Sequence, residues 1–536
     1  MTDGPAPGKQ QSVVESDAER LLVTGGPGTG KTRTALLLAR RLLEEEPPGR
    51  ARRVLFLTFS RSAVSELFER TPTLLPAALA GRVEIATFHG FAEAVLDAFG
   101  RYVGRGVTPV AIASEAEQNL HVAEPGSLTY DDLVPAASDL LTRAPWVRDR
   151  VAGRLLAIVC DEYQDTGDDQ DRLLRLLADG RKWICLADGD QMIYDWRADV
   201  GPRRLAQFRA LGPTEIVLEP TSHRDPSGVM PALASALRDQ DVRAAVVTDS
   251  LTAGRLRVAT VADPWPAAID EVRALRRLGH ETVGVFVTKR EFVEELAHEF
   301  VDAGIPHEIA GLDAAAGEAQ AAIAAMARFA VGDEAFDEVR KRSAIFLAAA
   351  QPRRNPPPLA IYLLNSPHVL PAPIQRRLTT LEAELRATAG EPMTELFRVA
   401  GEALSIFGWG HALWRLGVRD LFGQALDLAR RPLDSGSAEA LTRVAARRRS
   451  DALTSDLGSL RMPVRLMTMH QAKGREMDAV LVIHHVDDYL PDPLKHRRVL
   501  FVAASRARRA VSVLVPPTPH AQYAALASLA DPGVGI

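Results

Sequence analysis

The chain has 536 residues, of which 46% are hydrophobic and 25% are charged, and its formal net charge is −5. A chain of this length exceeds a single hydrophobic core and predicts several domains, and its composition is typical of globular proteins. No apolar run approaches the ~20 residues of a membrane helix, the N-terminal sequence lacks an apolar signal segment, and the slight negative charge excludes a uniformly basic surface.

Residues 20–215 alternate short apolar strands with helical patterns, which predicts a parallel sheet wrapped by helices. The expected strands are LLVT at 21–24, VLFLTF at 54–59, VEIATF at 83–88, LLAIVC at 155–160 and KWICLA at 182–187. Cys160 and Cys185, the only cysteines, end two of these strands and are expected in the core. A helical segment at 92–150 interrupts this module.

A second set of strand patterns predicts a second α/β module. Its members are IVLE at 216–219, RLRVATV at 255–261, TVGVFVT at 282–288, VRLMTM at 464–469, AVLVIH at 479–484 and AVSVLV at 510–515. The segment between its two halves, 311–460, is rich in Ala, Leu and Arg and has a helical period. We therefore expect an α/β fold of two modules, each with a mainly helical insertion. The first module spans 1–91 and 151–215 around insert 92–150, and the second spans 216–310 and 461–536 around insert 311–460.

A glycine-rich turn between the first strand and the next helix fits the pattern G-x-x-x-x-G-K-[ST]. Backbone N–H groups of such a turn converge on nucleotide phosphates. Lys31 is expected to reach the β- and γ-phosphates, and the Thr32 hydroxyl to bind Mg²⁺. The expected phosphate-binding residues are Gly25, Gly26, Pro27, Gly28, Thr29, Gly30, Lys31, Thr32 and Arg33. Kinases, transporters, switches and motors share this loop, so the loop alone does not choose among them.

Two adjacent acidic residues follow the apolar strand that ends at Cys160. Asp161 stands where a P-loop protein places the carboxylate that supports Mg²⁺. Glu162 is placed to orient or deprotonate an attacking water, which favours hydrolysis over transfer to an acceptor. The sequence therefore predicts an ATPase that uses ATP with Mg²⁺.

Seven segments in order along the chain resemble the motifs of the UvrD/Rep/PcrA-like superfamily 1 DNA helicases. They are TFSRSAVSEL at 58–67, TFHGFA at 87–92, DEYQDT at 161–166, GDQMIYDWR at 189–197, SHRDP at 222–226, TMHQAKGRE at 468–476 and LFVAASRAR at 500–508. The resemblance implies that both α/β modules are RecA-like. Their inserts are shorter than in the full-length repair helicases of this family.

The resemblance also implies roles for residues beyond the loop. Gln191 would sense the γ-phosphate, and Arg224 and Arg506 would act as arginine fingers, which are worth ~10³–10⁵ in rate. The implied adenine and ribose contacts are Gln10, His223 and Glu476, with His223 standing where the family usually has a tyrosine. The expected catalytic residues are Lys31, Glu162, Gln191, Arg224 and Arg506.

Aromatic and hydroxyl side chains at the ends of expected strands are candidates for DNA contacts. An aromatic side chain there can stack on an unpaired base of any kind. The implied DNA-binding residues are Thr58, Phe59, Thr87, Phe88, His89, Tyr194, Trp196, Arg197 and His470.

We therefore expect a cytoplasmic, ATP-dependent translocase and helicase that acts on single-stranded DNA or a single-strand/duplex junction in repair, recombination or defence. The family implies 3′→5′ movement. The chain is expected to be a monomer or weak dimer without membrane contact. The alternative is an ATP-fuelled nucleic-acid sensor or regulatory subunit that acts with a protein partner, such as a nuclease in anti-phage defence or a repair factor.

Overall fold

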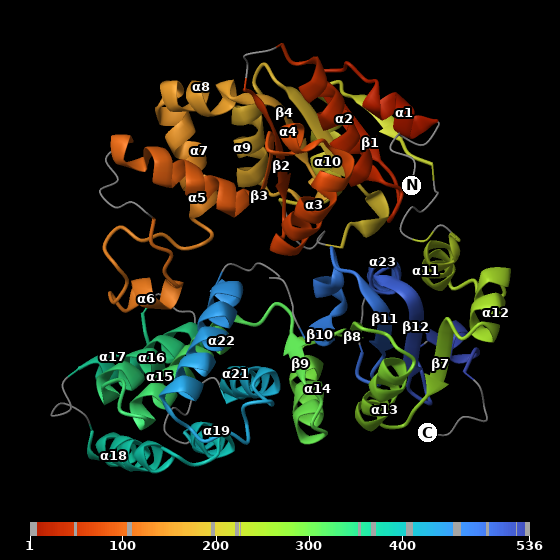
Figure 1. The fold of residues 1–536 in the computed structure, drawn as a ribbon. Coiled ribbons are helices and arrows are strands. Elements are labelled where there is room, and N and C mark those ends of the chain that lie inside the picture. The colour runs from red at the N-terminus through yellow and green to blue at the C-terminus, as the bar shows by residue number, and fades with distance from the viewer. Residues whose placement is uncertain are drawn as a thin grey trace. The chain divides into compact units, whose positions relative to one another are not determined.

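The computed structural model of this chain describes residues 8–47, 51–103, 110–193, 199–219, 225, 227–351, 355–365, 371–403, 411–453, 462–488, 493–520 and 523–530. The chain divides into two compact units (Figure 1). The first unit comprises Met1–Ala111, Asp131–Ala262 and Ala472–Ile536, and the second comprises Ile112–Tyr130 and Asp263–Gln471.

A six-stranded sheet with the order β3-β2-β4-β5-β1-β6 forms the centre of the first unit. Its strands are β1 (Arg20–Thr24), β2 (Arg53–Thr58), β3 (Val83–Thr87), β4 (Leu155–Cys160), β5 (Lys182–Ala187) and β6 (Thr214–Val217). All neighbouring pairs are parallel, which agrees with the expected α/β fold. The central strands are apolar along their whole length because helices bury both faces of the sheet. Cys160 and Cys185 are buried and free, as expected.

Helices that follow the strands cover this sheet (Figure 1). The helices of the first unit, with 3₁₀ turns marked η, are α1 (Lys9–Val14), α2 (Lys31–Glu45), α3 (Arg61–Leu74), α4 (Ala77–Ala80), α5 (Phe88–Phe99), η1 (Gly100–Val103), α7 (Leu133–Arg143), α8 (Pro145–Gly153), η2 (Tyr163–Asp165), α9 (Asp168–Ala178), η3 (Gly189–Gln191), α10 (Pro202–Arg209), α11 (Val229–Asp239), α12 (Ala245–Thr252), α23 (Pro493–Ala504) and α24 (Ala524–Ala527). Two helices begin at hydroxyl caps next to a strand end: Ser60 accepts from the Ala63 N–H at 3.1 Å, and Thr87 accepts from the Gly90 N–H at 3.0 Å.

The second sheet has six described strands. The first unit contributes three strands that are parallel neighbours in the order β7 (Leu256–Thr260), β12 (Ala507–Val515) and β11 (Met477–Ile483). The second unit contributes three strands that are parallel neighbours in the order β8 (Val283–Val287), β10 (Val464–Thr468) and β9 (His307–Ile309). The assignment of 216–219 to the second module's strands was wrong, because β6 pairs with β1 in the first sheet. Strand β9 was not expected from the sequence.

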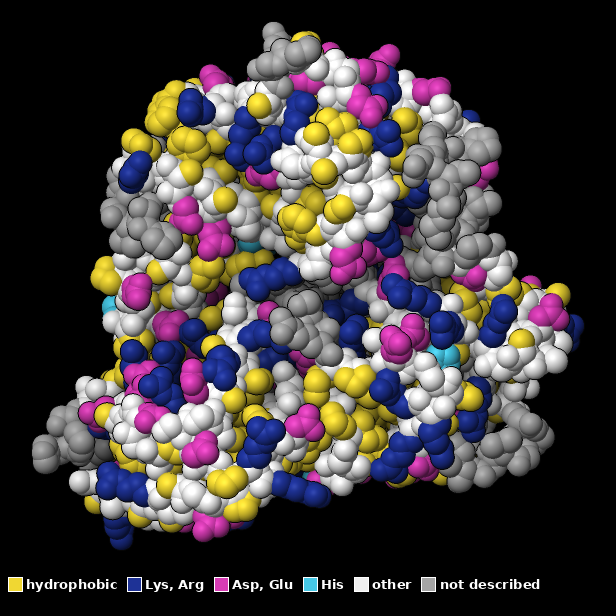
Figure 2. All heavy atoms as spheres, in the orientation of Figure 1, with side chains coloured by type: hydrophobic (Ala, Val, Ile, Leu, Met, Phe, Trp, Pro, Cys, Tyr) yellow, Lys and Arg dark blue, Asp and Glu magenta, His cyan; other side chains and the backbone are white. Residues whose placement is uncertain are grey.

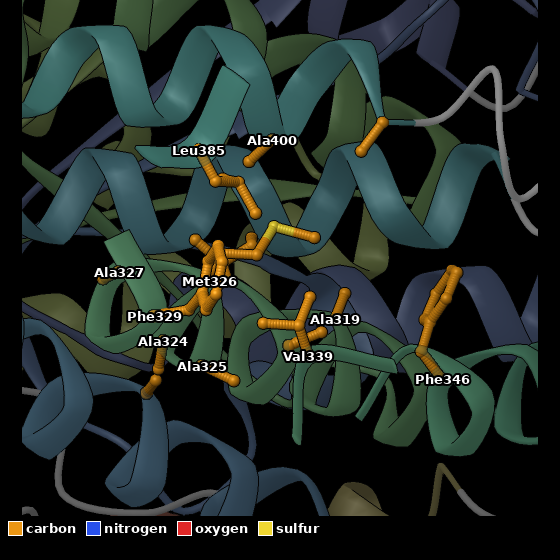
Figure 3. Close-up of a cluster of buried hydrophobic side chains, with 14 of the residues drawn as sticks. Ala319, Ala324, Ala325, Met326, Ala327, Phe329, Val339, Phe346, Leu385 and Ala400 are labelled. Carbon is orange, nitrogen blue, oxygen red and sulfur yellow. The ribbon is translucent and has the colours of Figure 1, made fainter. Parts of the chain in front are cut away.

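The second unit is mainly helical. Its helices and its 3₁₀ turn are α6 (Glu115–Asn119), α13 (Pro264–Arg277), α14 (Arg290–Asp302), α15 (Ala314–Ala330), α16 (Phe336–Ala350), α17 (Pro358–Leu364), α18 (Ala372–Ala387), α19 (Met393–Glu402), α21 (His411–Gln424), α22 (Ser435–Leu453) and η5 (Met469–Ala472). The alanine-rich α15 is largely buried, and its Met326 and Phe329 belong to one hydrophobic cluster with Val339, Leu385 and Ala400 from three other helices (Figure 3). Among the helices that the structure describes, none is long and apolar enough to cross a membrane.

Candidate nucleotide-binding site

The glycine-rich loop connects β1 to α2, as the sequence predicts. Gly28 and Gly30 have φ angles of 74° and 86°, in the left-handed region that L-residues with a side chain rarely adopt. Gly30 caps α2, so the free N–H groups of the first helical turn lie next to the loop. A Cβ at Gly25 would lie 2.8 Å from the Thr29 hydroxyl, so the loop is also closely packed there. This geometry is that of a phosphate-binding loop at a helix N-terminus.

The ammonium group of Lys31 lies inside this loop. Its Nζ donates to the carbonyl oxygens of Gly25 at 2.6 Å and Gly26 at 3.0 Å, and lies 3.8 Å from Oδ2 of Asp188. The side chain is 9% exposed, so its charge is held by carbonyl dipoles and one carboxylate. A nucleotide phosphate would offer the same ammonium group a stronger, charged acceptor.

Thr32 and Asp161 provide the oxygen atoms that the sequence predicts for Mg²⁺. The Thr32 hydroxyl donates to Oδ2 of Asp161 at 3.0 Å, and Asp161 lies directly after β4. Burial, together with the charge of Glu162, raises the pKa of Asp161 to about 6, so a nearby cation would stabilise its ionised form. Mg²⁺ in nucleotide sites usually takes one or two protein oxygens and the rest from phosphate and water. The two residues fit this pattern, and among the described residues no three His, Cys, Asp or Glu side chains form a metal site of their own.

Glu162 adopts a backbone conformation that is uncommon for a residue with a side chain. Its φ is 52° and its ψ is 39°, and its N–H donates to Oδ1 of Asp161 at 2.9 Å. Its carboxylate accepts a hydrogen bond from the Gln164 amide. Burial alone would raise the pKa of Glu162, but the positive charges of Lys473 and Lys31 outweigh burial and lower it. The carboxylate is therefore held ionised, as a group that accepts a proton from water must be.

A line of polar contacts runs from Lys31 to Arg506. Gln191 lies in η3 and donates from Nε2 to Oδ2 of Asp188 at 2.7 Å, the same oxygen that faces Lys31. Arg506 is 3% exposed and donates from Nη2 to Oε1 of Gln191 at 3.2 Å. The Arg506 Nε–H donates to the Val502 carbonyl at 2.8 Å, which fixes the direction of the guanidinium group.

Lys473 is a site residue that the sequence reasoning missed. Its Nζ lies 2.6 Å from Oδ2 of Asp165 and 4.0 Å from Oε2 of Glu162, and it donates to the Gln191 carbonyl. Burial raises the pKa of Asp165 to about 7, and Lys473 opposes that rise. The signal was present, because Lys473 lies in the TMHQAKGRE segment that carries the resemblance.

Three other expected nucleotide contacts have definite positions. Gln10 is buried and donates from Nε2 to the Thr29 carbonyl at 2.9 Å, so it lies against the phosphate-binding loop. Glu476 accepts from Arg508 at 2.8 Å. Arg33 is partly exposed in the first turn of α2.

The expected DNA contacts of the first unit lie at the ends of β2 and β3. Thr58 ends β2, and Thr87 ends β3 and caps α5. The rings of Phe59 and Phe88 are 5.3 Å apart, and Phe88 is only 1% exposed. Phe88 therefore supports the ring of Phe59 from inside rather than offering its own face to a base. Burial lowers the pKa of the neighbouring His89 to about 4.

The remaining expected site residues are placed less fully. His470 lies in η5 of the second unit and is partly exposed. The structure's described residues do not include Tyr194, Trp196, Arg197, His223 and Arg224.

A strand, a glycine-rich loop and a helix that hold Lys31 and Thr32 beside an acidic strand end define the P-loop nucleotide-binding proteins. The UvrD/REP helicase N-terminal domain matches this chain over residues 7–129 and 111–202, and the UvrD-like helicase C-terminal domain matches residues 463–514. The matched segments, 7–202 and 463–514, are similar to the UvrD-like superfamily 1 helicases.

Curated relatives agree with this family. The chain is 27% identical over 250 residues to the ATP-dependent DNA helicase PcrA of Leuconostoc citreum, which covers 35% of this chain and 33% of that protein. It is 26% identical over 252 residues to PcrA of Staphylococcus aureus strain Mu50, covering 36% and 34%. It is 27% identical over 249 residues to the ATP-dependent DNA helicase Rep of Salmonella typhimurium, covering 35% and 36%. The matched region spans about a third of the length of each relative.

Proposed function

We propose that this protein hydrolyses ATP to move along single-stranded DNA and to separate duplex DNA, with 3′→5′ polarity. The observation that carries the proposal is the polar line from Lys31 through Asp188 and Gln191 to Arg506. It connects the phosphate-binding loop to a buried arginine from the C-terminal part of the chain. An enzyme that only transfers a phosphoryl group needs the loop, but it does not need this connection. The names of the relatives, ATP-dependent DNA helicases, support the same reading.

Hydrolysis would proceed from the groups that the site provides. Lys31 would bind the β- and γ-phosphates, and Thr32 and Asp161 would hold Mg²⁺, which would neutralise phosphate charge when bound. Glu162 would accept the proton of a water whose oxygen bonds to the γ-phosphorus, while the bond from that phosphorus to the β–γ bridging oxygen breaks and ADP leaves. Its lowered pKa keeps it ionised for this step.

Coupling to movement would depend on the groups around Gln191. Its side chain contacts Asp188 and Arg506, and its backbone carbonyl accepts from Lys473. Loss of the γ-phosphate would change the charge that Lys31 and Arg506 meet, and the shared Gln191 would transmit that change to the segment after η3. This segment carries the expected DNA contact Trp196. Stacking on an unpaired base is worth ~1–3 kcal/mol and does not depend on the base.

A strand-displacement assay tests this proposal. Duplexes with a single-stranded tail at either the 3′ or the 5′ end would be incubated with the protein, ATP and Mg²⁺. We expect displacement from the 3′-tailed duplex and none with Lys31→Ala. Displacement from the 5′-tailed duplex alone would contradict the polarity. Turnover of ATP without displacement of either duplex would instead favour the sensor that acts through a protein partner.

A further inference from the structure

An exposed cluster of aromatic side chains lies in the first unit, away from the nucleotide site. Tyr102 of η1 is 58% exposed and Trp146 of α8 is 52% exposed, both among the most exposed large hydrophobic side chains that the structure describes. Trp146 packs edge-on with Tyr102 at 5.9 Å and with Phe99 at 6.1 Å between ring centroids. An edge-to-face pair covers a face of only one of its two rings, so flat aromatic surface remains accessible.

Arginine side chains surround these rings. The Arg101 guanidinium lies 4.8 Å from the Tyr102 ring centroid and donates to the Tyr102 hydroxyl at 2.8 Å. Arg150 follows Trp146 by one helical turn and shares its exposed side of α8, and Arg143 ends α7 just before α8. Among the described residues no carboxylate pairs with Arg101, Arg143 or Arg150, whereas the neighbouring Arg148 pairs with Asp149 at 3.2 Å. Figure 2 shows Lys and Arg side chains beside hydrophobic ones over the part of the first unit that carries α8.

We propose that Tyr102 and Trp146, with Arg101, Arg143 and Arg150, form a second binding surface for single-stranded nucleic acid. Exposed aromatic side chains next to arginines that have no carboxylate partner are the combination that stacks bases and holds phosphates without reading sequence. A protein partner that bound through the same rings would need acidic groups to meet three cations, whereas a nucleic-acid strand supplies both components in every nucleotide. The surface lies at the opposite end of α5 from the expected DNA contacts, since α5 begins at Phe88 beside Thr87 and ends at Phe99 beside these rings, about 18 Å away at 1.5 Å per residue.

The inference rests on the proposed function in one respect, because the chain must bind DNA. Its test is the affinity of the whole protein for a fluorescent 20-nucleotide oligo(dT), measured by anisotropy without nucleotide. The double variant Tyr102→Ala/Trp146→Ala is expected to bind about 10-fold more weakly, because stacking contributes ~1–3 kcal/mol per base and 1.4 kcal/mol is a factor of ten. Trp146→Phe should retain most of the affinity, since the ring remains. The kcat of ATP hydrolysis at saturating DNA should not change, because none of these residues touches the nucleotide site.

The arginines provide an independent second measurement. Arg143→Gln/Arg150→Gln should lower the slope of log affinity against log salt by about 1.4, at ~0.7 per phosphate contact of a single strand. Arg398→Gln is the matched control, because Arg398 is exposed but paired with Glu395 at 2.6 Å and Glu402, and it should leave the slope unchanged. Ultraviolet crosslinking of the oligonucleotide should label the peptides that contain Tyr102 or Trp146.

The outcomes separate this inference from the proposed function. If the wild-type protein bound no DNA, both would fail. If it bound DNA and the aromatic variant bound equally well at unchanged salt slope, with no crosslink to Tyr102 or Trp146, only the second surface would be refuted. A melting temperature of the aromatic variant equal to that of the wild type would show that lost affinity does not come from unfolding.

Discussion

Arg506 donates a hydrogen bond to the side chain of Gln191 at 3.2 Å, although the two residues are 315 positions apart in the sequence. The other end of Gln191 is bonded to Asp188, which also faces the Lys31 ammonium. The proposed coupling of ATP hydrolysis to DNA would need a link of this kind, because the state of the γ-phosphate must reach groups outside the phosphate-binding loop. Gln191 therefore contacts both Asp188, beside the phosphate-binding loop, and Arg506, from the C-terminal part of the chain.

The first prediction concerns this pair. Gln191→Ala and Arg506→Gln should each reduce the kcat of DNA-stimulated ATP hydrolysis, with the loss for Arg506→Gln about 10³-fold or more, as for other arginines that stabilise the transferring phosphoryl group. The double variant should be no worse than the worse single variant, because residues that act as a unit are not additive. Arg509→Gln, a change at an exposed arginine of β12, is the control and should keep the wild-type kcat. Additive losses in steady-state turnover would show that the two residues act separately.

The second prediction separates binding from chemistry. Lys31→Ala should lose both affinity for a fluorescent ATP analogue and turnover, because the ammonium group inside the loop is removed. Glu162→Gln should keep that affinity while turnover falls by about 10²–10⁴-fold, the usual contribution of a general base. If Glu162→Gln hydrolysed ATP at the wild-type rate, another group would have to accept the proton.

The third prediction concerns the buried charges around Lys473. Lys473→Met should lower the melting temperature by about 10 °C, because breaking a buried ion pair costs ~3–5 kcal/mol and leaves a carboxylate without a partner. Asp165→Asn added to Lys473→Met should restore most of that loss, since it removes the unpaired charge. Lys341→Met, which removes a partly exposed pair with Glu338, should change the melting temperature by little. No rescue by Asp165→Asn would mean that Lys473 acts through packing.

The fourth prediction is a pH dependence of stability. Burial lowers the pKa of His89 to about 4, whereas the unfolded chain titrates near 6.5. Between these values the unfolded state binds more protons than the folded state. The free energy of unfolding is therefore highest above about pH 6.5 and decreases by roughly 2–3 kcal/mol as the pH falls toward 4. His89→Gln should therefore flatten the fall in melting temperature over this range, and the exposed His520→Gln should not. Parallel pH profiles for the wild type and His89→Gln would refute the assignment.

The strands with continuous apolar sequence were predicted well. Strands β4 and β5 have the bounds that the sequence indicates, because both faces of a central parallel strand are buried and the whole segment is apolar. The three residues of β9 are too few to form a pattern. Strand β6 lies at the edge of the first sheet because it pairs with β1. The local sequence of a strand does not determine which strand it pairs with, so this position was not predicted.

The nucleotide site also contains residues that the local sequence predicts and a residue that it does not. Lys31 and Thr32 belong to one short motif, and Asp161 follows a strand that its apolar sequence predicts. The local sequence therefore predicted that they share one site, where the Thr32 and Asp161 oxygens lie 3.0 Å apart. Lys473 meets Gln191 from 282 positions away, a distance over which residue type and spacing carry no signal of contact. The TMHQAKGRE segment marked Lys473 as a candidate, but its contacts with Asp165 and Glu162 are seen only in the folded chain.

Coupling of ATP hydrolysis to DNA can be measured as the rate of ATP hydrolysis by the purified protein with and without oligo(dT), at several salt concentrations. We expect low basal turnover, strong stimulation by the single strand, and an apparent DNA affinity that falls steeply with salt, as phosphate contacts require. ATP turnover that is the same with and without nucleic acid would contradict the proposed function, because hydrolysis at the site of Gln191 and Arg506 would then not be coupled to DNA.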